Sequence, residues 1–442
     1  MKPCLFLARA AAITGWVAAC LPTLGQPCPP YWDPSLGQPG LQQLGSGFAM
    51  QVFNARLYAG GLFFIGGTGT FQGIARWDGS MWVPVGDGVG GGTPGVAALA
   101  VFNDGSGPAL YAGGRFMSAG GNPAIHIARW DDTSWSTLGS GVNPGVAGQS
   151  GVFALAVFDD GGGPALYAGG EFSTAGAAVV NNIAKWNGSF WAPLGSGFAN
   201  GVVYALCVYD DGTGPALYAG GNLAGGPSGI AKWTSLGWSA LPSQVSGTVF
   251  AFAVFNGELY AGGEFLNAGS VSAPRVAKWN GNSWSALGAG LDNTVRALAV
   301  FDDGSGPAVF AGGDFVFSGT QFVNHVAAWN GTTWRNLQGG TNGPVLGMGL
   351  DGRSLVIGGL IGAVGSGQPA TGVARWVNCT PCYPNCNGST TQPFLNVNDF
   401  ACFLNAFAAG LPYANCDAST VPPVLNVNDF FCFINQFAAG CP

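Results

Sequence analysis

The chain has 442 residues, of which 77 are Gly and only 8% are charged, and its formal net charge is −7. This composition indicates many short strands joined by tight turns rather than a helical globule. The negative charge and the lack of any cluster of Lys or Arg argue against nucleic acid and anionic membranes as partners, because both bind basic surfaces.

Residues 1–25 have the pattern of an export signal. Lys2 and Arg9 precede an apolar run that is too short to span a bilayer, and small residues follow up to Gly25, where we expect cleavage. The sequence VAAC, which ends at Cys20, leaves open a lipid-modified N-terminus instead. No later stretch is long enough for a transmembrane span. We expect a secreted, extracellular or cell-surface attached protein, whose cysteines form disulfides in an oxidising compartment.

A unit of four strand-like segments recurs between residues 45 and 378. One copy reads "VFALAVFDD", "ALYAGGEF", "NIAKWNG" and "FWAPLGSG", with Asp-Asp-Gly and Asn-Gly hairpin signals between them. The Trp of the third segment marks seven copies: Trp77, Trp130, Trp186, Trp233, Trp279, Trp329 and Trp376. Seven such units predict a mainly β fold, a seven-bladed β-propeller of four-stranded blades over residues 26–378.

The seventh unit breaks off after "VARWVN" and lacks its fourth strand. Residues 31–48 end in the same LGSGF that ends the third unit, so they are predicted to complete the last blade and close the ring. Cys28 precedes this segment, and Cys379 or Cys382 follows the last blade. These cysteines are placed to join the seam by a disulfide.

The repeat resembles that of Kelch and galactose-oxidase-type propellers, in which paired Gly close a strand and a spaced Trp follows. The copper chemistry of galactose-oxidase-like propellers requires two His and a Tyr crosslinked to Cys. This chain has only His126 and His325, and both stand immediately before the third strand of their units. Position in the repeat explains these two residues better than metal ligation does.

The residue after each Gly pair belongs to the face with the long, variable loops, which is where binding is expected. In five of the seven units it is polar or charged. These predicted ligand-binding residues are Arg115, Glu171, Asn222, Glu264 and Asp314. They would surround a site for a glycan or a peptide. The alternative, that strand ends turn polar where they meet water, stays open.

No catalytic residue is predicted. Most carboxylates belong to repeated turns such as Asp159-Asp160, where they bond to their own backbone. A glycosidase needs two carboxyl groups flanking the scissile bond, and Glu171, Glu264 and Asp314, which share one face, keep that reading open. Cys207 is expected to be a buried free thiol.

Residues 379–442 form a separate, cysteine-rich tail that holds seven of the eleven cysteines. Residues 385–410 and 415–440 are two copies of one sequence, each with apolar residues at helical spacing and a final Gly. Neither helix can bury its apolar stripe alone. The tail is therefore predicted to be a two-helix module.

Each copy contains "LNVND" before its helix, and in this the tail resembles a dockerin, a duplicated half-EF-hand module. The resemblance implies a cohesin-like or cell-envelope receptor as partner and Ca²⁺ as cofactor. The implied calcium ligands are Asn385, Asn387, Asn396, Asp399, Asn415, Asp417, Asn426 and Asp429. These loops have few carboxylates for Ca²⁺, so a core held by disulfides is a compatible alternative. The disulfide candidates are Cys28, Cys379, Cys382, Cys386, Cys402, Cys416, Cys432 and Cys441, and no pairing is chosen.

The leading hypothesis is a secreted propeller that binds or displays a ligand and is attached through a dockerin-like tail. The alternatives are a carbohydrate-active enzyme carried on a dockerin and a structural component of the envelope.

Overall fold

The computed structural model describes residues 30–378 and Leu404, except for short gaps at 39, 66–72, 92–94, 144–149, 224–228 and 235. The chain divides into two compact units: one is Pro30–Asn378, and the other combines Met1–Pro29 with Cys379–Pro442. Among the described residues, no helix has the length and apolar character that crossing a membrane requires.

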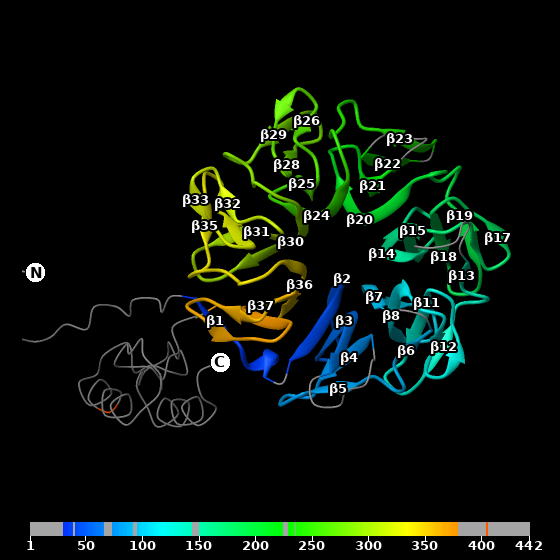
Figure 1. Ribbon diagram of the computed structural model, residues 1–442. Helices are drawn as coiled ribbons and strands as arrows, with labels where there is room; N and C mark the ends of the chain where they lie inside the picture. Colours follow the sequence, from blue (N-terminus) through cyan, green and yellow to red (C-terminus); the bar gives the residue numbers. More distant parts are fainter. Residues whose placement is uncertain are drawn as a thin grey trace, which may run out of the picture. The chain divides into compact units, whose positions relative to one another are not determined.

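Within the described residues, seven four-stranded antiparallel sheets stand as blades around a common centre, as in a β-propeller (Figure 1). The innermost strands are β2 (Leu41–Phe53), β7 (Gly95–Asn103), β14 (Gly151–Asp159), β20 (Val202–Asp210), β24 (Val249–Phe255), β30 (Val295–Asp302) and β36 (Val345–Asp351). The second strands are β3 (Arg56–Ile65), β8 (Pro108–Arg115), β15 (Pro164–Glu171), β21 (Pro215–Asn222), β25 (Glu258–Gly263), β31 (Pro307–Gly313) and β37 (Ser354–Gly359).

The outer half of each blade is shorter. The third strands are β4 (Ile74–Trp77), β11 (Ile127–Trp130), β18 (Ile183–Trp186), β22 (Ile230–Thr234), β28 (Val276–Trp279), β34 (Val326–Trp329) and β40 (Val373–Val377). The fourth strands are β5 (Trp82–Pro84), β12 (Trp135–Thr137), β19 (Trp191–Pro193), β23 (Gly237–Ala240), β29 (Trp284–Ala286), β35 (Trp334–Asn336) and β1 (Tyr31–Asp33), which follows β40 in the seventh blade.

Two-residue strands in the loops between blades and between second and third strands make small additional sheets. They are β6 (Val89–Gly90), β9 (Ser118–Ala119), β10 (Asn122–Pro123), β13 (Val142–Asn143), β16 (Thr174–Ala175), β17 (Ala178–Val179), β26 (Asn267–Ala268), β27 (Val271–Ser272), β32 (Phe317–Ser318), β33 (Gln321–Phe322), β38 (Ala363–Val364) and β39 (Gln368–Pro369). One 3-10 turn, η1 (Ser35–Gly37), follows β1.

The innermost strands contribute to the cores between blades and, near one end, to the wall of the central channel. In β7, Val96, Ala98 and Phe102 are buried between blades, whereas Ala97 and Leu99 are partly exposed. Successive side chains of a strand point to opposite faces of its sheet, and both faces pack against a neighbouring blade. Leu99 packs into the core shared with the first blade, whereas Phe102 belongs to the core shared with the third. Each innermost strand contacts the next along the chain, and β36 contacts β2, which closes the ring.

The Gly pair at the end of each second strand allows the blades to pack closely. A Cβ added at Gly169 would lie 2.5 Å from Cγ1 of Val203 in the next blade. At Gly170, a Cβ would collide with the backbone oxygen of Gly151 in the same blade. Only a residue without a side chain fits either position, which explains why the pair recurs in every unit.

The Trp residues join neighbouring blades. The indole N–H of each fourth-strand Trp donates to a backbone oxygen that follows the fourth strand of the preceding blade, as Trp238 does to Leu194 at 3.0 Å. The ring also closes in this way, because Trp32 of β1 donates to Leu337 at 2.7 Å and Trp82 donates to Leu36 at 2.7 Å.

The strand that completes the seventh blade lies inside the predicted segment 31–48 but covers only Tyr31–Asp33. The LGSGF of residues 44–48 lies in β2, the innermost strand of the first blade, and not in the last blade. Leu36 is the true equivalent of Leu194, because each accepts the Trp hydrogen bond of the following blade. The sequence match at LGSGF therefore placed part of this segment in the wrong blade.

Candidate functional site

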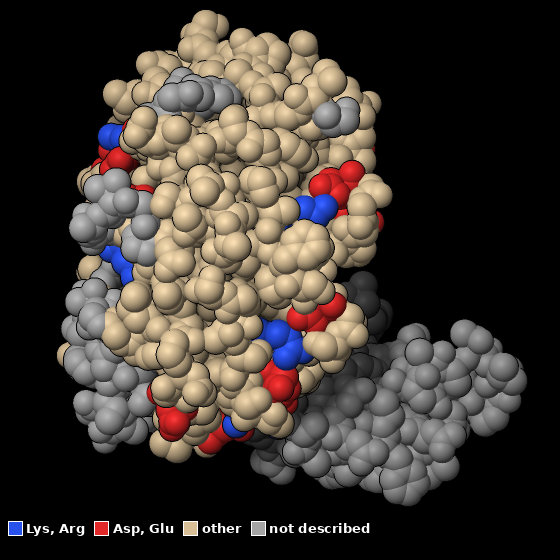
Figure 2. Space-filling model, turned by 90° about the vertical axis from the view of Figure 1, so that its right-hand side faces the viewer, with Lys and Arg blue, Asp and Glu red and all other residues tan. Residues whose placement is uncertain are grey.

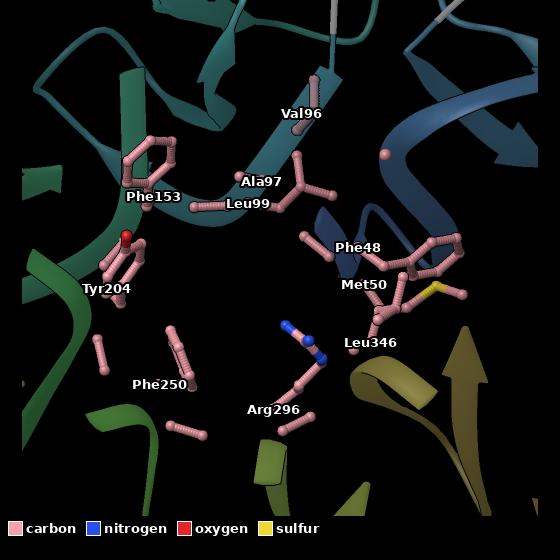
Figure 3. A pocket seen from close by; sticks show the side chains of 18 of the residues that line it. Phe48, Met50, Val96, Ala97, Leu99, Phe153, Tyr204, Phe250, Arg296 and Leu346 are labelled. Atoms are coloured by element: carbon pink, nitrogen blue, oxygen red, sulfur yellow. The ribbon is translucent and has the colours of Figure 1, made fainter. Parts of the chain in front are cut away.

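A cavity of about 730 Å³ occupies the centre of the ring (Figure 3). Its wall is made by the innermost strands of all seven blades, with contributions from Leu62 within β3 and from Arg115 at the end of β8. It opens on the face where the second strands end, and we call this opening the channel mouth. The variable loops between second and third strands lie on the same face.

In six blades, the pairing between the first and second strands skips one residue of the innermost strand near the mouth. The skipped residues, which we call the bulge residues, are Ala97, Phe153, Tyr204, Phe250, Arg296 and Leu346. A β-bulge leaves its extra residue outside the hydrogen-bond ladder and redirects the side chain. All six line the cavity.

Three successive bulge residues, Phe153, Tyr204 and Phe250, form an aromatic arc along one side of the mouth (Figure 3). The Phe153 and Tyr204 rings are stacked with centroids 5.6 Å apart and planes at 20°. Tyr204 meets Phe250 edge to face, with centroids 5.1 Å apart. All three side chains are only partly buried. Aromatic side chains that are packed on each other but open to solvent give a rigid apolar platform.

An arginine stands at each end of the aromatic arc. The guanidinium of Arg115 lies 5.1 Å from the ring centroid of Phe153, and that of Arg296 lies 6.0 Å from the centroid of Phe250. Arg296 is also bound by Asp314, whose carboxylate accepts from Nε at 2.8 Å and from Nη2 at 2.7 Å. Arg115 makes no ion pair within the part of the chain that the structure describes.

The five predicted ligand-binding residues all lie at the mouth end of their blades. Arg115, Glu171 and Asn222 are the last residues of β8, β15 and β21, and Glu264 and Asp314 directly follow β25 and β31. Of the five, Arg115 contributes to the cavity wall, whereas the other four stand around it.

The carboxylates beside the arc affect its central residue. Burial raises the pKa of Tyr204; Glu171 and Glu264 also raise it, and Arg115 opposes them. Glu171 and Glu264 thus lie close enough to Tyr204 to interact with it electrostatically. Their blades flank the blade of Tyr204.

Sequence reasoning missed the bulge residues. Their signal was present in the otherwise regular first strand, where one position varies between a constant Val and a small residue: "VAA", "VFA", "VYA", "VFA", "VRA" and "VLG". The prediction relied on variation in the loops and did not consider variation at a single position within a repeated strand. The bulge explains it, because the position faces the channel instead of the blade interface.

His126 and His325 occupy a backbone position that is shared by all seven blades. Their φ angles are 62° and 67°, and the equivalent Asn182 and Arg275 have φ of 66° and 68°. The remaining blades have Gly there with positive φ. Burial lowers the pKa of both imidazoles. No group of three or more His, Cys, Asp or Glu side chains could hold a metal ion among the described residues.

The opposite face is built from repeated ion pairs. In the turn after β14, Asp159 accepts from the backbone N–H groups of Gly161 and Gly163, as expected for a turn carboxylate. Its neighbour Asp160 binds Lys185 at 2.6 Å. Charged side chains are scarce on the side of the molecule that Figure 2 shows, and red and blue groups lie next to one another there.

Several predictions fall on residues that the structure does not describe. These are the export signal at 1–25, Cys28, the calcium ligands Asn385, Asn387, Asn396, Asp399, Asn415, Asp417, Asn426 and Asp429, and the cysteines from Cys379 to Cys441. Cys207, in β20, is a free thiol as expected, but it is half-buried instead of buried; desolvation raises its pKa to about 12.

No family model matches the chain, and no curated protein matches it at a significant level. Among solved structures, it is similar to the extracellular domain of the putative one component system BT4673 from B. thetaiotaomicron, at 12% identity over 76% of this chain and 37% of that one, with a TM-score of 0.44. The WD40 β-propeller domain of Doa1 is 11% identical over 78% and 96% of the two chains, with a TM-score of 0.45.

A computationally designed protein, Ika8, is 15% identical over 76% of this chain and 98% of its own, with a TM-score of 0.43. The chain spans 37% and 40% of the length of the two BT4673 chains that it matches. The propeller assignment rests on the sheets of the chain itself, and its function has to be argued from the site.

Proposed function

We propose that this protein is a binding and display module that takes a glycan at the channel mouth. The observation that carries the proposal is the aromatic arc, Phe153, Tyr204 and Phe250, which borders a cavity of about 730 Å³. The face of a pyranose ring that carries C–H groups packs well on aromatic rings, while its hydroxyls need polar partners around it. An arc on three successive blades offers room for more than one sugar residue.

The polar residues at the ends of the second strands supply those partners. Asn222 belongs to the same blade as Tyr204, and Glu171 and Glu264 belong to the blades on either side. Carboxylates accept hydrogen bonds from sugar hydroxyls, and the Asn amide both donates and accepts. A peptide is the other ligand that the polar ring suggests, but a row of partly exposed aromatic rings suits a sugar better.

We infer that binding is better supported than hydrolysis. A glycosidase needs two carboxyl groups on opposite sides of the scissile bond, roughly 5 to 10 Å apart. Of the three candidate carboxylates, Asp314 is occupied by Arg296, and Glu171, Glu264 and Asp314 are all absent from the residues that line the described cavity. A purely structural envelope component would not require the mouth to vary from blade to blade while the opposite face repeats.

We also propose that residues 379–442 attach the exported propeller to a cohesin-like partner or to the cell envelope, with Ca²⁺, disulfides or both holding the module together. The dockerin resemblance of the two "LNVND" copies supports this part of the proposal.

The glycan site can be tested by replacing the central ring of the arc. An array of neutral and acidic oligosaccharides would first identify ligands of the full-length protein. Tyr204→Ala should then weaken binding about tenfold, because it removes one stacking surface. Isothermal titration calorimetry measures the change.

Val208→Ala is the matched control, since Val208 lies on the same strand as Tyr204, toward the opposite end of the channel, and is 36% exposed. Its affinity should equal that of the wild type. Unchanged binding in Tyr204→Ala, or no binding of any glycan by the wild-type protein, would show that the arc is not a glycan site.

The tail can be tested by deleting residues 379–442 in a host that exports the protein. The truncated propeller should remain folded by circular dichroism but appear in the medium instead of on the cell surface. Retention at the surface without the tail would contradict the proposed attachment. A calcium titration of the full-length protein, compared with an Asp399→Asn, Asp429→Asn variant, would separate a calcium-dependent module from a disulfide-held one.

A further inference from the structure

Arg115 is an exception among the cations of the propeller. Most described Lys and Arg side chains are paired with carboxylates, such as Lys185 with Asp160 and Lys232 with Asp211, each at 2.6 Å. Arg115 has no such partner within the described residues, although it contributes to the wall of the central cavity. A cation left unpaired at a cavity is available for an anionic group of a ligand.

The blade that contains Arg296 shows how an arginine binds a carboxylate at the channel mouth. There the bulge residue is Arg296 and the residue after the Gly pair is Asp314, and the two form a two-pronged ion pair. In the blade of Arg115 the arrangement is reversed: the arginine follows the Gly pair, and the bulge residue is Ala97. The protein therefore provides a cation there but no carboxylate, and the methyl group of Ala97 fills little of the space that a long bulge side chain would occupy.

The position of Arg115 over Phe153 fixes its guanidinium without using its hydrogen bonds. The Cζ atom lies 5.1 Å from the ring centroid, within the range of a cation–π contact. Guanidinium groups held on an aromatic face keep their N–H edges free, and these edges match the two oxygens of a carboxylate. Arg115 and Arg296 are the charged side chains among the described residues that line the cavity, and Asp314 neutralises Arg296, so the uncompensated positive charge of the wall is that of Arg115.

We propose that the ligand of the channel mouth is an acidic oligosaccharide in which a uronic acid carboxylate is bound by Arg115 while the sugar rings pack on the aromatic arc. This inference rests on the proposed function and specifies its ligand. Glu171 and Glu264, which stand near Tyr204, accept hydrogen bonds from neutral hydroxyls but repel further carboxylates. The favoured ligand therefore carries isolated uronic acids among neutral sugars.

The experiment uses the full-length protein and three acidic probes of different linkage: aldotetraouronic acid, a hyaluronan tetrasaccharide and trigalacturonate. Each is compared with its carboxyl-reduced form, in which the uronic acid becomes a neutral sugar. At least one acidic probe should bind the wild type about tenfold more tightly than its reduced form, as a charge-assisted hydrogen-bonded pair provides. Arg115→Gln should abolish this preference.

Arg115→Lys keeps the charge but loses the planar fork, so it should retain only part of the preference. Arg56→Gln is the matched control: it also removes one positive charge, from an arginine that is 47% exposed at the opposite face and paired with Asp132. This variant should bind like the wild type.

Two results would overturn the inference while leaving a glycan site intact. Either the reduced forms bind as tightly as the acids with Tyr204→Ala still weakening both, or Arg115→Gln keeps the full preference. Tighter binding of an acidic peptide, hexaglutamate, than of any saccharide would overturn the choice of ligand. No binding of any acidic or reduced probe would overturn both this inference and the proposed glycan site.

Discussion

The two faces of the propeller use the same seven blades in opposite ways. Near the turns between first and second strands, most blades hold an ion pair of one kind, such as Asp211 with Lys232 at 2.6 Å. At the channel mouth, equivalent positions hold side chains as different as Ala97, Phe153 and Arg296. In a chain with so few charges, the repeated pairs support the fold, and the varied residues are free to serve a ligand.

The repeated face keeps the interaction even where its residues change. The sixth blade has Ala328 in its third strand where the other six blades have Lys or Arg, and the cation comes instead from Arg335, its partner across the sheet. The fifth blade lacks the Asp-Asp turn, and there Glu258 pairs with Lys278 at 2.8 Å. An ion pair that is kept although its residues change indicates that the fold requires it. At the mouth, the residues change from blade to blade without keeping a common interaction.

The largest loss of stability should come from removing Asp303, the buried carboxylate among the repeated ion pairs. Asp303 is fully buried and accepts hydrogen bonds from Arg335 and from the indole of Trp376 in the next blade, the latter at 2.8 Å. Asp303→Ala leaves both donors without a partner, which should lower the free energy of unfolding by about 3 to 5 kcal/mol. Chemical denaturation of the purified protein measures the change.

Asp302→Ala is the neighbouring control. Asp302 is exposed, and its carboxylate accepts from the backbone N–H groups of Gly304 and Gly306, so its loss should cost about 1 kcal/mol. Equal destabilisation by both variants would contradict a special role of the buried carboxylate.

The wild-type protein and the Asp303→Ala variant also give a test of pH dependence. Burial raises the pKa of Asp303, but hydrogen bonds from Trp376 and Arg335 outweigh burial and hold the pKa below its usual range. A carboxyl with a lowered pKa stabilises the fold above its unfolded value of about 3.9, and this contribution is lost as pH falls through the folded pKa. The melting temperatures of wild type and Asp303→Ala should therefore converge below about pH 4.

Much of the scaffold was predictable because each blade repeats the same local physics. The Gly pairs, hairpin turns and spaced Trp residues are visible in every unit, and they led to four-stranded sheets and to a ring closed by the N-terminal segment. The one misplaced piece, residues 44–48, arose because LGSGF occurs in two structural contexts. At residues 194–198 the sequence LGSGF forms the loop in which Leu194 accepts the hydrogen bond of Trp238, whereas at residues 44–48 it belongs to an innermost strand. Identity over five residues does not distinguish these two contexts.

The site was harder to predict than the scaffold because it depends on a β-bulge. The alternation of β14 predicts Val152 and Ala154 on one face of the sheet and Phe153 on the other. In the structure Val152 and Ala154 are buried, and the skipped pairing places Phe153, which lies between them, in the channel wall. The five polar residues after the Gly pairs lie at the mouth end of their blades, and among them only Arg115 contributes to the cavity wall. The repeated sequence shows which positions vary. Which of them meet at the central channel becomes visible only when the blades are arranged in a closed ring.

The smallest predicted effect, and the sharpest test of the comparison, concerns the ion pair of Arg296 with Asp314 at the mouth. Asp314→Asn removes the charge that neutralises Arg296, whose side chain is 30% exposed. A partly exposed pair contributes about 0 to 1 kcal/mol, so the melting temperature should hardly change. A second uncompensated arginine at the cavity wall should raise the affinity for an acidic oligosaccharide roughly threefold, about 0.6 kcal/mol. Calorimetry and a melting curve on the same sample measure both quantities.

The gain should persist in the double variant Arg115→Gln, Asp314→Asn, relative to Arg115→Gln alone, because the two arginines belong to different blades and act on the ligand separately. A large drop in melting temperature, with no gain in affinity, would mean that this pair supports the fold as the pairs on the opposite face do. The division between a constant face and a variable mouth would then fail at the sixth blade, and Arg296 would have to be counted with the scaffold instead of with the site.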